Sequence, residues 1–126
     1  MNPVKSAAAT TKAAGDAAEG RALAYLRQQG LTLAARNYRT PGRGGGEIDL
    51  VLWDRDGTLV FVEVRKRGSR AFGGAAASVG LQKQRRIVFA ARHYLLGLRS
   101  APPCRFDVIS MEGGGIQWMR ADFDAG

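Results

Sequence analysis

Two apolar stretches in the middle of this chain carry charged side chains where a buried strand would be purely apolar. Glu47 and Asp49 lie at the beginning of the first stretch, and Glu63 and Arg65 lie near the end of the second. Three carboxylates and a guanidinium close together could bind a hard divalent cation, because ions such as Mg²⁺ prefer oxygen ligands. Whether these groups meet depends on the elements that carry them.

The two stretches predict a β-hairpin whose loop fixes the register. Residues 48–53 and 58–65 are rich in Val, Ile, Leu, Phe and Trp, as strands are. A two-residue turn would direct Glu63 to the face opposite Asp49. A three-residue loop at 55–57, closed by a left-handed glycine, instead pairs the two residues directly. We expect the three-residue loop, which also brings the other two charged residues onto the same face.

Two directly paired carboxylates need a compensating charge. The β-carbons of paired residues lie about 4.5–5.5 Å apart, so two ionised groups repel each other unless a proton or a cation lies between them. Mg²⁺ or Mn²⁺ would relieve the repulsion, with Asp49, Glu63 and Glu47 as candidate ligands. The alternative is a solvated strand end whose carboxylates form surface ion pairs.

The hairpin sequence resembles that of a known family. Gly-Glu-Ile-Asp-Leu at 46–50 and Val-Phe-Val-Glu-Val-Arg at 60–65 are similar to the YraN-type family of small uncharacterised bacterial proteins. The hairpin also resembles that of the PD-(D/E)XK nuclease superfamily, particularly the Holliday-junction resolvases. The similarity covers residues 15–123, with further matching segments at Gly15–Leu26, Arg36–Arg39, Gly73–Gly74, Lys83–Gln84 and Arg105–Ile109.

This resemblance implies catalytic roles for several side chains. Asp49 and Glu63 would be metal ligands, Glu47 would tune or join the metal shell, and Glu19 would complete it. In the superfamily a lysine two residues after the glutamate assists the attacking water, but this chain has Arg65 there. An arginine can hold a phosphate but cannot lose its proton, so it cannot act as a general base.

Glu19 lies on the apolar side of a helix predicted over residues 15–29. At 3.6 residues per turn it falls on the same stripe as Leu23 and Leu26. A carboxylate on a buried face needs a partner, and in resolvase-like relatives a glutamate of the first helix leans over the acidic hairpin. The alternative is a first-turn glutamate that is favoured only by the helix dipole.

The composition is strongly basic. Lys and Arg outnumber Asp and Glu by 19 to 11, which gives a formal net charge of +8 and a pI near 10.6. This favours an anionic partner, first of all nucleic acid, and the resemblance indicates DNA. A membrane partner fits less well, since no apolar stretch approaches the ~20 residues of a membrane span; simple solubility is the remaining explanation. The candidate nucleic-acid contacts are Arg36, Arg39, Arg43, Arg67, Arg70, Lys83, Gln84, Arg85 and Arg86.

Two basic segments are placed to approach phosphate groups. The glycine-rich segment 40–46, with Arg43 at its centre, leads directly into the hairpin. Backbone amides and guanidinium groups of such a loop can contact phosphates, although glycine runs also form ordinary turns. A second helix is predicted over residues 81–98. Lys83 or Gln84 near its start could reach the acidic end of the sheet, but their spacing favours a surface position at the helix end.

The expected order of elements is helix, strand, hairpin, helix and two further strands. This order predicts a single α/β domain with a central mixed sheet of four or five strands flanked by two helices, similar to the restriction-endonuclease core. Residues 1–13 are small and polar and are expected to form a disordered tail before a domain at 14–124. One cysteine excludes an internal disulfide, and the absence of a secretory signal indicates a cytoplasmic protein.

Together these features predict a metal-dependent nuclease that hydrolyses phosphodiester bonds in DNA, including branched or repair intermediates. Arg65 at the usual lysine position supports an alternative, a non-catalytic nucleic-acid-binding module that keeps the nuclease fold. A third hypothesis is a scaffold that recruits a repair or replication partner through the basic loop. The sequence leaves the choice between DNA and RNA open, and also the oligomeric state, a homodimer included.

Overall fold

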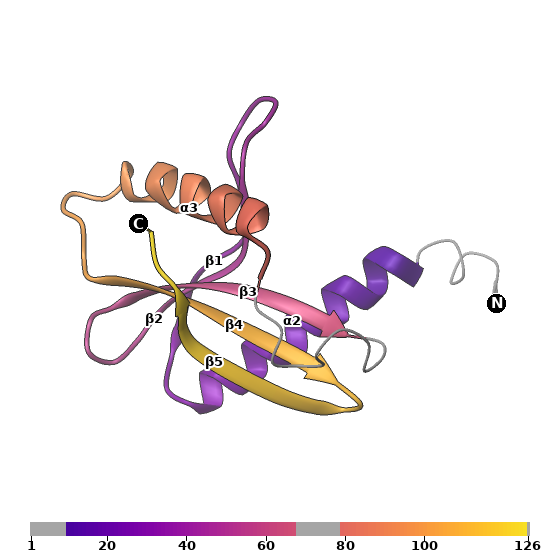
Figure 1. Ribbon diagram of the computed structural model, residues 1–126. Helices are drawn as coiled ribbons and strands as arrows, with labels where there is room; N and C mark the ends of the chain where they lie inside the picture. The colour runs from indigo at the N-terminus through magenta and orange to yellow at the C-terminus, as the bar shows by residue number, and fades with distance from the viewer. Residues whose placement is uncertain (1–9, 68–78, 126) are drawn as a thin grey trace, which may run out of the picture.

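The computed structural model describes residues 10–67 and 79–125. Within them the chain forms two helices and five strands, in the order α2 (Thr10–Gln28), β1 (Thr32–Arg39), β2 (Glu47–Trp53), β3 (Leu59–Arg67), α3 (Leu81–Leu95), β4 (Cys104–Glu112) and β5 (Gly115–Phe123). The strands make one mixed sheet in the order β1-β2-β3-β4-β5 (Figure 1). The predicted single-domain α/β fold with a four- or five-stranded sheet is confirmed.

The hairpin of β2 and β3 has the predicted register. Leu50 pairs with Val62 and Trp53 with Leu59, and both pairs agree with a three-residue loop. Gly57 has the left-handed conformation that closes such a loop, with φ +89°. The loop therefore sets the register as far as Leu50 and Val62, where the ladder ends, so the expected direct pairing of Asp49 with Glu63 and of Glu47 with Arg65 is not part of it.

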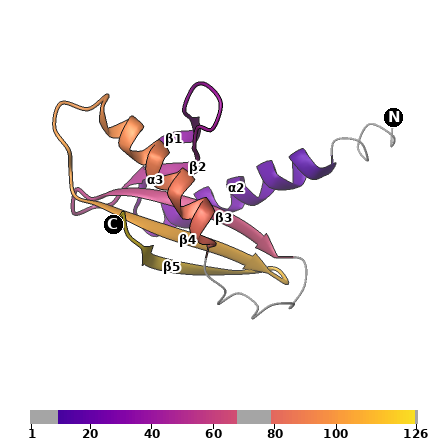
Figure 2. The ribbon, with the colours of Figure 1, turned by 45° about the horizontal axis from the view of Figure 1, so that its top comes forward.

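The crossover through α3 makes the sheet mixed. β3 and β4 are parallel, and the other three neighbouring pairs are antiparallel. A parallel pair needs a long connection, which a helix packed on the sheet provides. Figure 2 shows α3 crossing one face of the sheet, so that its first turn lies near the end of β3.

Each helix covers a different core cluster. On one face, Leu23 and Leu26 of α2 pack with Leu50 and Val62. On the other face, Ile87 of α3 packs in a second cluster, whose strand residues include Phe61 and Val108. Because both faces are covered, the central strands are apolar on both sides. Side chains at the end of the hairpin can consequently be reached from both helices.

Three boundaries differ from the sequence-based expectation, in which the first strand spans residues 31–37. α2 begins at Thr10 instead of residue 15, so residues 10–13 are helical and not part of a disordered tail. An ion pair between Lys12 and Asp16, four residues apart, supports this extra turn. α3 ends at Leu95, since Gly97 follows closely and glycine is a poor helix former. β1 continues to Arg39; the expected tail at residues 1–9 lies outside the described residues.

Candidate active site

The ladder between β2 and β3 ends at the pair Leu50 and Val62, and β2 changes face just beyond it. Leu50 packs beneath α2, whereas Ile48, two residues earlier, packs beneath α3. Residues two apart in a regular strand share a face, so the alternation is broken at Asp49. The edge strand β1 changes face at the same level, where Asn37 has a left-handed φ of +54°.

Asp49 is held at this opening of the hairpin. The backbone N–H of Val64 donates a hydrogen bond of 2.8 Å to Asp49 Oδ2. Asp49 also lies close enough to Glu19 and to Glu63 to raise the pKa of both groups. The break in β2 therefore brings together one carboxylate from each of α2, β2 and β3. These three side chains, Glu19, Asp49 and Glu63, form the acidic group of the site.

Glu63 is the most deeply buried carboxylate of the three. Its side chain is only 6% exposed, and Lys83 Nζ lies 2.9 Å from Glu63 Oε2. Burial first and the charge of Asp49 second raise the pKa of Glu63 to about 7, although the hydrogen bond from Lys83 acts in the opposite direction. Near neutral pH the carboxyl group of Glu63 can therefore lose its proton when a metal cation binds to it.

Glu19 approaches Asp49 from the opposite side of the sheet. Burial and then the charge of Asp49 raise the pKa of Glu19, while the charge of Arg36 lowers it. Arg36 Nε lies 3.7 Å from Glu19 Oε1, but this buried oxygen accepts no hydrogen bond from the described residues. The helix dipole alone does not account for this position, because Glu19 lies in the third turn of α2 and not in its first.

Lys83 lies in the first turn of α3 and points to the acidic group. Its own burial acts to lower its pKa, but the hydrogen bond to Glu63 and the charges of Glu63, Asp49 and Glu47 outweigh burial and raise it. The spacing favoured a surface position at the helix end, and Lys83 is indeed 55% exposed, yet its amine also reaches Glu63. The available signal was its place one turn before Ile87 on the buried stripe of α3.

The donor set suits a hard cation with few protein ligands. Among residues 10–67 and 79–125, no three His, Cys, Asp or Glu side chains are arranged to hold a metal ion. Asp49 and Glu63 nevertheless form an adjoining carboxylate pair, and Mg²⁺ is usually held by one or two carboxylates together with water and phosphate oxygens. The pair fits such an ion, and the buried oxygen of Glu19 adds negative charge beside it.

A shallow cavity adjoins this group. Glu63, Arg65 and Lys83 line a space of about 350 Å³, together with Val79 and Gly80 at the start of α3. Three cationic side chains, Arg65, Lys66 and Lys83, thus line the cavity beside the buried carboxylate. A phosphate group entering the cavity would meet positive charge from both β3 and α3.

Several of the predicted nucleic-acid contacts are held within the protein. Besides its ion pair with Glu19, Arg36 donates to the backbone oxygen of Asp16 at 3.1 Å. Arg39 Nε lies 3.9 Å from Glu47 Oε1, and the Glu47 side chain is 42% exposed. Glu47 thus lies at the solvent edge of the acidic group, and Arg36 serves to position Glu19.

The glycine-rich segment between β1 and β2 is pinned to the structure at its base. Thr40 and Gly46 exchange hydrogen bonds: the Gly46 N–H donates to Thr40 Oγ1 at 2.8 Å, and the Thr40 N–H donates to the Gly46 oxygen at 3.0 Å. Gly46 also packs so tightly against α3 that a β-carbon there would lie 1.9 Å from the Arg86 oxygen. Arg43 remains exposed at the tip.

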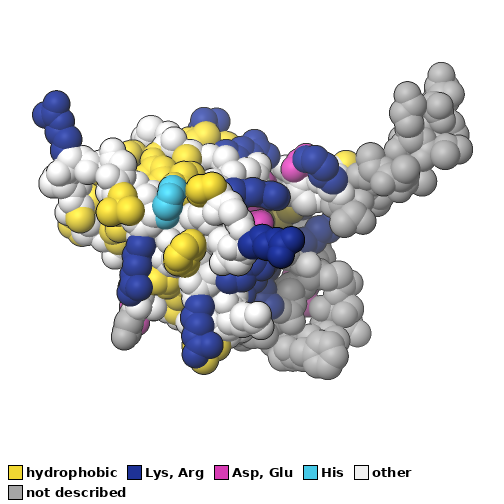
Figure 3. Space-filling model, turned by 90° about the horizontal axis from the view of Figure 1, so that it is seen from above, with side chains coloured by type: hydrophobic (Ala, Val, Ile, Leu, Met, Phe, Trp, Pro, Cys, Tyr) yellow, Lys and Arg dark blue, Asp and Glu magenta, His cyan; other side chains and the backbone are white. Residues whose placement is uncertain are grey.

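The remaining candidate contacts lie on α3, at the end of β3 and just after it. Gln84 Nε2 donates to the Val79 oxygen at 2.8 Å and so closes the start of α3 instead of reaching the carboxylates. Arg85 and Arg86 are exposed. Arg67 ends β3, but its side chain is not described, and Arg70 lies outside the described residues. Lys and Arg dominate the charged groups visible on the face that carries α3 (Figure 3).

A second charged network, built around Asp107, is structural. Asp107 is buried and accepts hydrogen bonds from Arg105 Nε, Trp118 Nε1 and the Ala121 N–H. Arg105 also pairs with Asp54 at 2.8 Å, and this hydrogen bond lowers the pKa of Asp54. The network ties the hairpin loop to β4 and β5.

Comparison with known proteins places the chain in a family. The model of "Uncharacterised protein family UPF0102" matches residues 18–111. A UPF0102 protein from Paracidovorax citrulli is 70% identical over 117 residues, which cover 93% of this chain and 87% of the relative. One from Acidovorax sp. strain JS42 is 66% identical, covering 94% and 89%, and one from Albidiferax ferrireducens is 62% identical, covering 97% and 95%. None of these names states an activity.

Proposed function

The chain belongs to the UPF0102 family of uncharacterised proteins, which is the YraN-type family that its sequence predicted. The family name states no activity. We propose that this protein is a metal-dependent nuclease, which hydrolyses phosphodiester bonds in DNA. Glu63 is the residue on which this proposal rests. It is a buried carboxylate beside Asp49 whose pKa is raised to about 7, and it faces a cavity lined by three cationic side chains.

Asp49 and Glu63 would hold Mg²⁺ or Mn²⁺. Once bound, such an ion lowers the pKa of a water molecule and neutralises charge on a phosphate. Asp49 is already oriented by the Val64 N–H, so little side-chain ordering remains. Glu63 would lose its proton when the ion binds, and Glu19 would add negative charge from the other face. Glu47 lies at the edge and would contribute through solvent.

Lys83 has the chemistry that Arg65 lacks. An ammonium group can lose a proton, whereas a guanidinium group cannot. The neighbouring carboxylates raise the pKa of Lys83, so its proton would become easier to remove only when a cation neutralises their charge. Lys83 Nζ contacts Glu63, and Lys83 would release this carboxylate if Glu63 held an ion. The amine would then be available to the phosphate or to the attacking water, while Arg65 would supply fixed positive charge.

The alternative is a binding module that no longer cleaves. The observation in its favour is Arg65, which stands where the resemblance to nucleases calls for a lysine. In that case the basic surface would still bind nucleic acid, with strong salt dependence, but Lys83 would serve only to neutralise Glu63. Activity assays of variants at these two positions separate the two functions.

The test combines metal binding with cleavage. Calorimetry with Mn²⁺ and cleavage of labelled duplex, fork, junction and single-stranded DNA would be measured for the natural protein, Asp49→Asn and Glu63→Gln. Asp56→Asn, at the exposed tip of the hairpin loop, is the matched control. We expect the first two variants to lose Mn²⁺ binding and to cleave about 100-fold less or worse, which corresponds to several kcal/mol, and the control to behave as the natural protein.

Lys83→Met and Lys83→Arg test the role of the amine. If Lys83 exchanges a proton, both variants lose cleavage while retaining Mn²⁺ binding. If only positive charge is needed, Lys83→Arg stays active. Mn²⁺ binding without cleavage of any of the substrates, by the natural protein and by Arg65→Lys alike, would leave the binding module as the function.

A further inference from the structure

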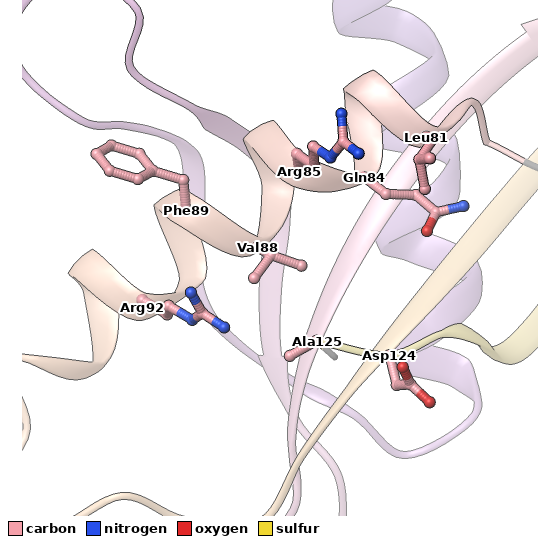
Figure 4. Close-up of a pocket in the computed structure, with 8 residues that line it drawn as sticks. All are labelled: Leu81, Gln84, Arg85, Val88, Phe89, Arg92, Asp124 and Ala125. Carbon is pink, nitrogen blue, oxygen red and sulfur yellow. The ribbon is translucent and has the colours of Figure 1, made fainter.

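The outward side of α3 carries a groove that has no part in the acidic group. It has a volume of about 530 Å³ and lies between α3 and the C-terminal segment at residues 124–125. Val88 lies along its floor, and Figure 4 shows this side chain directed toward Ala125. Large apolar side chains remain exposed on its rim: Leu81 is 62% exposed and Phe89 is 53% exposed.

The charge of this helix indicates what the groove can bind. Arg85 and Arg92 lie four residues before and three residues after Phe89, so the three positions fall on the same side of the helix. Figure 4 shows the two guanidinium groups on the groove side of α3 and the Phe89 ring directed away from the groove. The whole of α3 contains three arginines, a lysine and a histidine but no acidic residue, and the C-terminal side of the groove contributes one carboxylate, Asp124. The helix therefore favours an anionic partner. The exposed ring of Phe89 offers a base a surface on which to stack, which favours nucleic acid over an acidic protein surface.

We propose that this face of α3 binds single-stranded nucleic acid, with an unpaired base stacked on Phe89 and the flanking phosphates held by Arg85 and Arg92. A paired base cannot lie against the ring without leaving its duplex, so the surface distinguishes single strands from double strands. The groove deepens the proposed function: Lys83 contacts Glu63 six residues before Phe89, about 9 Å along the helix axis. A strand bound along α3 would thus lead to the acidic group. The identification of this nucleic-acid strand as the substrate rests on the proposed function, whereas the binding of a single strand to α3 does not.

Binding is measured without cleavage, in EDTA, by fluorescence anisotropy. The probes are a labelled oligothymidylate of about 16 nucleotides, the length of a large single-strand site, and a blunt duplex of the same length. Phe89→Ala should weaken binding of the single strand about 5- to 100-fold and leave the duplex nearly unchanged. Phe89→Trp should restore it. Leu96→Ala, which removes an exposed apolar side chain just after α3, is the control and should have no effect.

The arginines are tested through the salt dependence. Arg85→Ala and Arg92→Ala should each reduce the slope of log K against log[salt] by about 0.7 for a single strand. Arg27→Ala, an exposed arginine at the end of α2, should not change it.

Three results would overturn the proposal. Phe89→Ala could leave single-strand binding unchanged, it could weaken single strand and duplex equally, or it could dissociate a dimer in sedimentation experiments, which would make the groove an interface between two copies. Asp49→Asn should keep the Phe89-dependent binding. A protein that binds single strands through Phe89 but never cleaves would contradict the proposed function and leave this inference intact.

Discussion

The raised pKa of Glu63 makes a quantitative prediction about stability. In the metal-free protein this buried carboxyl group keeps its proton to about pH 7, whereas in the unfolded chain it ionises near 4.5. Between these pH values the folded state binds a proton that the unfolded state has released. The free energy of unfolding therefore falls as pH rises through this window, and it is independent of this group below and above it.

The size of the effect follows from the pKa difference. About two and a half pKa units, at 1.36 kcal/mol per unit, amount to about 3 kcal/mol. Glu63→Gln removes the titration and keeps the shape of the side chain. The variant should consequently match the natural protein near pH 4.5 and become more stable than it by up to about 3 kcal/mol above pH 7.

Urea unfolding in EDTA across this pH range measures the difference. Glu112→Gln, on a carboxylate away from the acidic group, is the control and should show no such pH dependence. Mn²⁺ at 100 times its Kd should cancel the difference above pH 7, because the ion stabilises the natural protein by about 3 kcal/mol and does not bind to the variant. A constant difference between the two proteins at all pH values would refute the assignment of a proton to Glu63.

Three further predictions concern the surroundings of the site. Arg65→Lys should leave Mn²⁺-dependent cleavage unchanged or raise it, as measured with labelled DNA; a large loss would show that the guanidinium itself is needed. Gly46→Ala should lower both the melting temperature and Mn²⁺ affinity, because its β-carbon would lie 1.9 Å from the Arg86 oxygen and displace α3; unchanged calorimetry would contradict this packing. Asp107→Ala should destabilise the fold by about 3–5 kcal/mol in urea, since it leaves the partly buried Arg105 without one of its carboxylate partners, yet Mn²⁺ should still bind to the protein that remains folded.

The part of the site that depends on local chemistry could be predicted from the sequence. The three-residue loop with Gly57 in the left-handed region determines the register of the hairpin. The loop conformation and the register both depend only on about a dozen neighbouring residues. The helical stripe placed Glu19 on the buried face of its helix, and its position over the acidic hairpin was expected from the resemblance alone.

The contact of Lys83 with Glu63 could not be predicted in the same way. The contact depends on where the crossover helix begins relative to the end of β3, and no sequence pattern in the connecting segment predicts that position. A helix shifted by one turn would move the amine by about 5 Å and leave it in solvent. The position of Gly46 against the Arg86 oxygen is one of the contacts that fix α3, but periodicity in either segment does not reveal it.

The break at Asp49 links these observations. If β2 alternated regularly, Ile48 would lie with Leu50 beneath α2, and Asp49 would lie with Glu63 beneath α3, beyond the reach of Glu19. The ladder instead ends at Leu50, and the side chain of Asp49 takes its hydrogen bond from the Val64 N–H. A strand residue that breaks the local pattern costs stability and is retained where the site needs it. Here the irregularity is what allows carboxylates on opposite faces of one sheet to share a single charge environment.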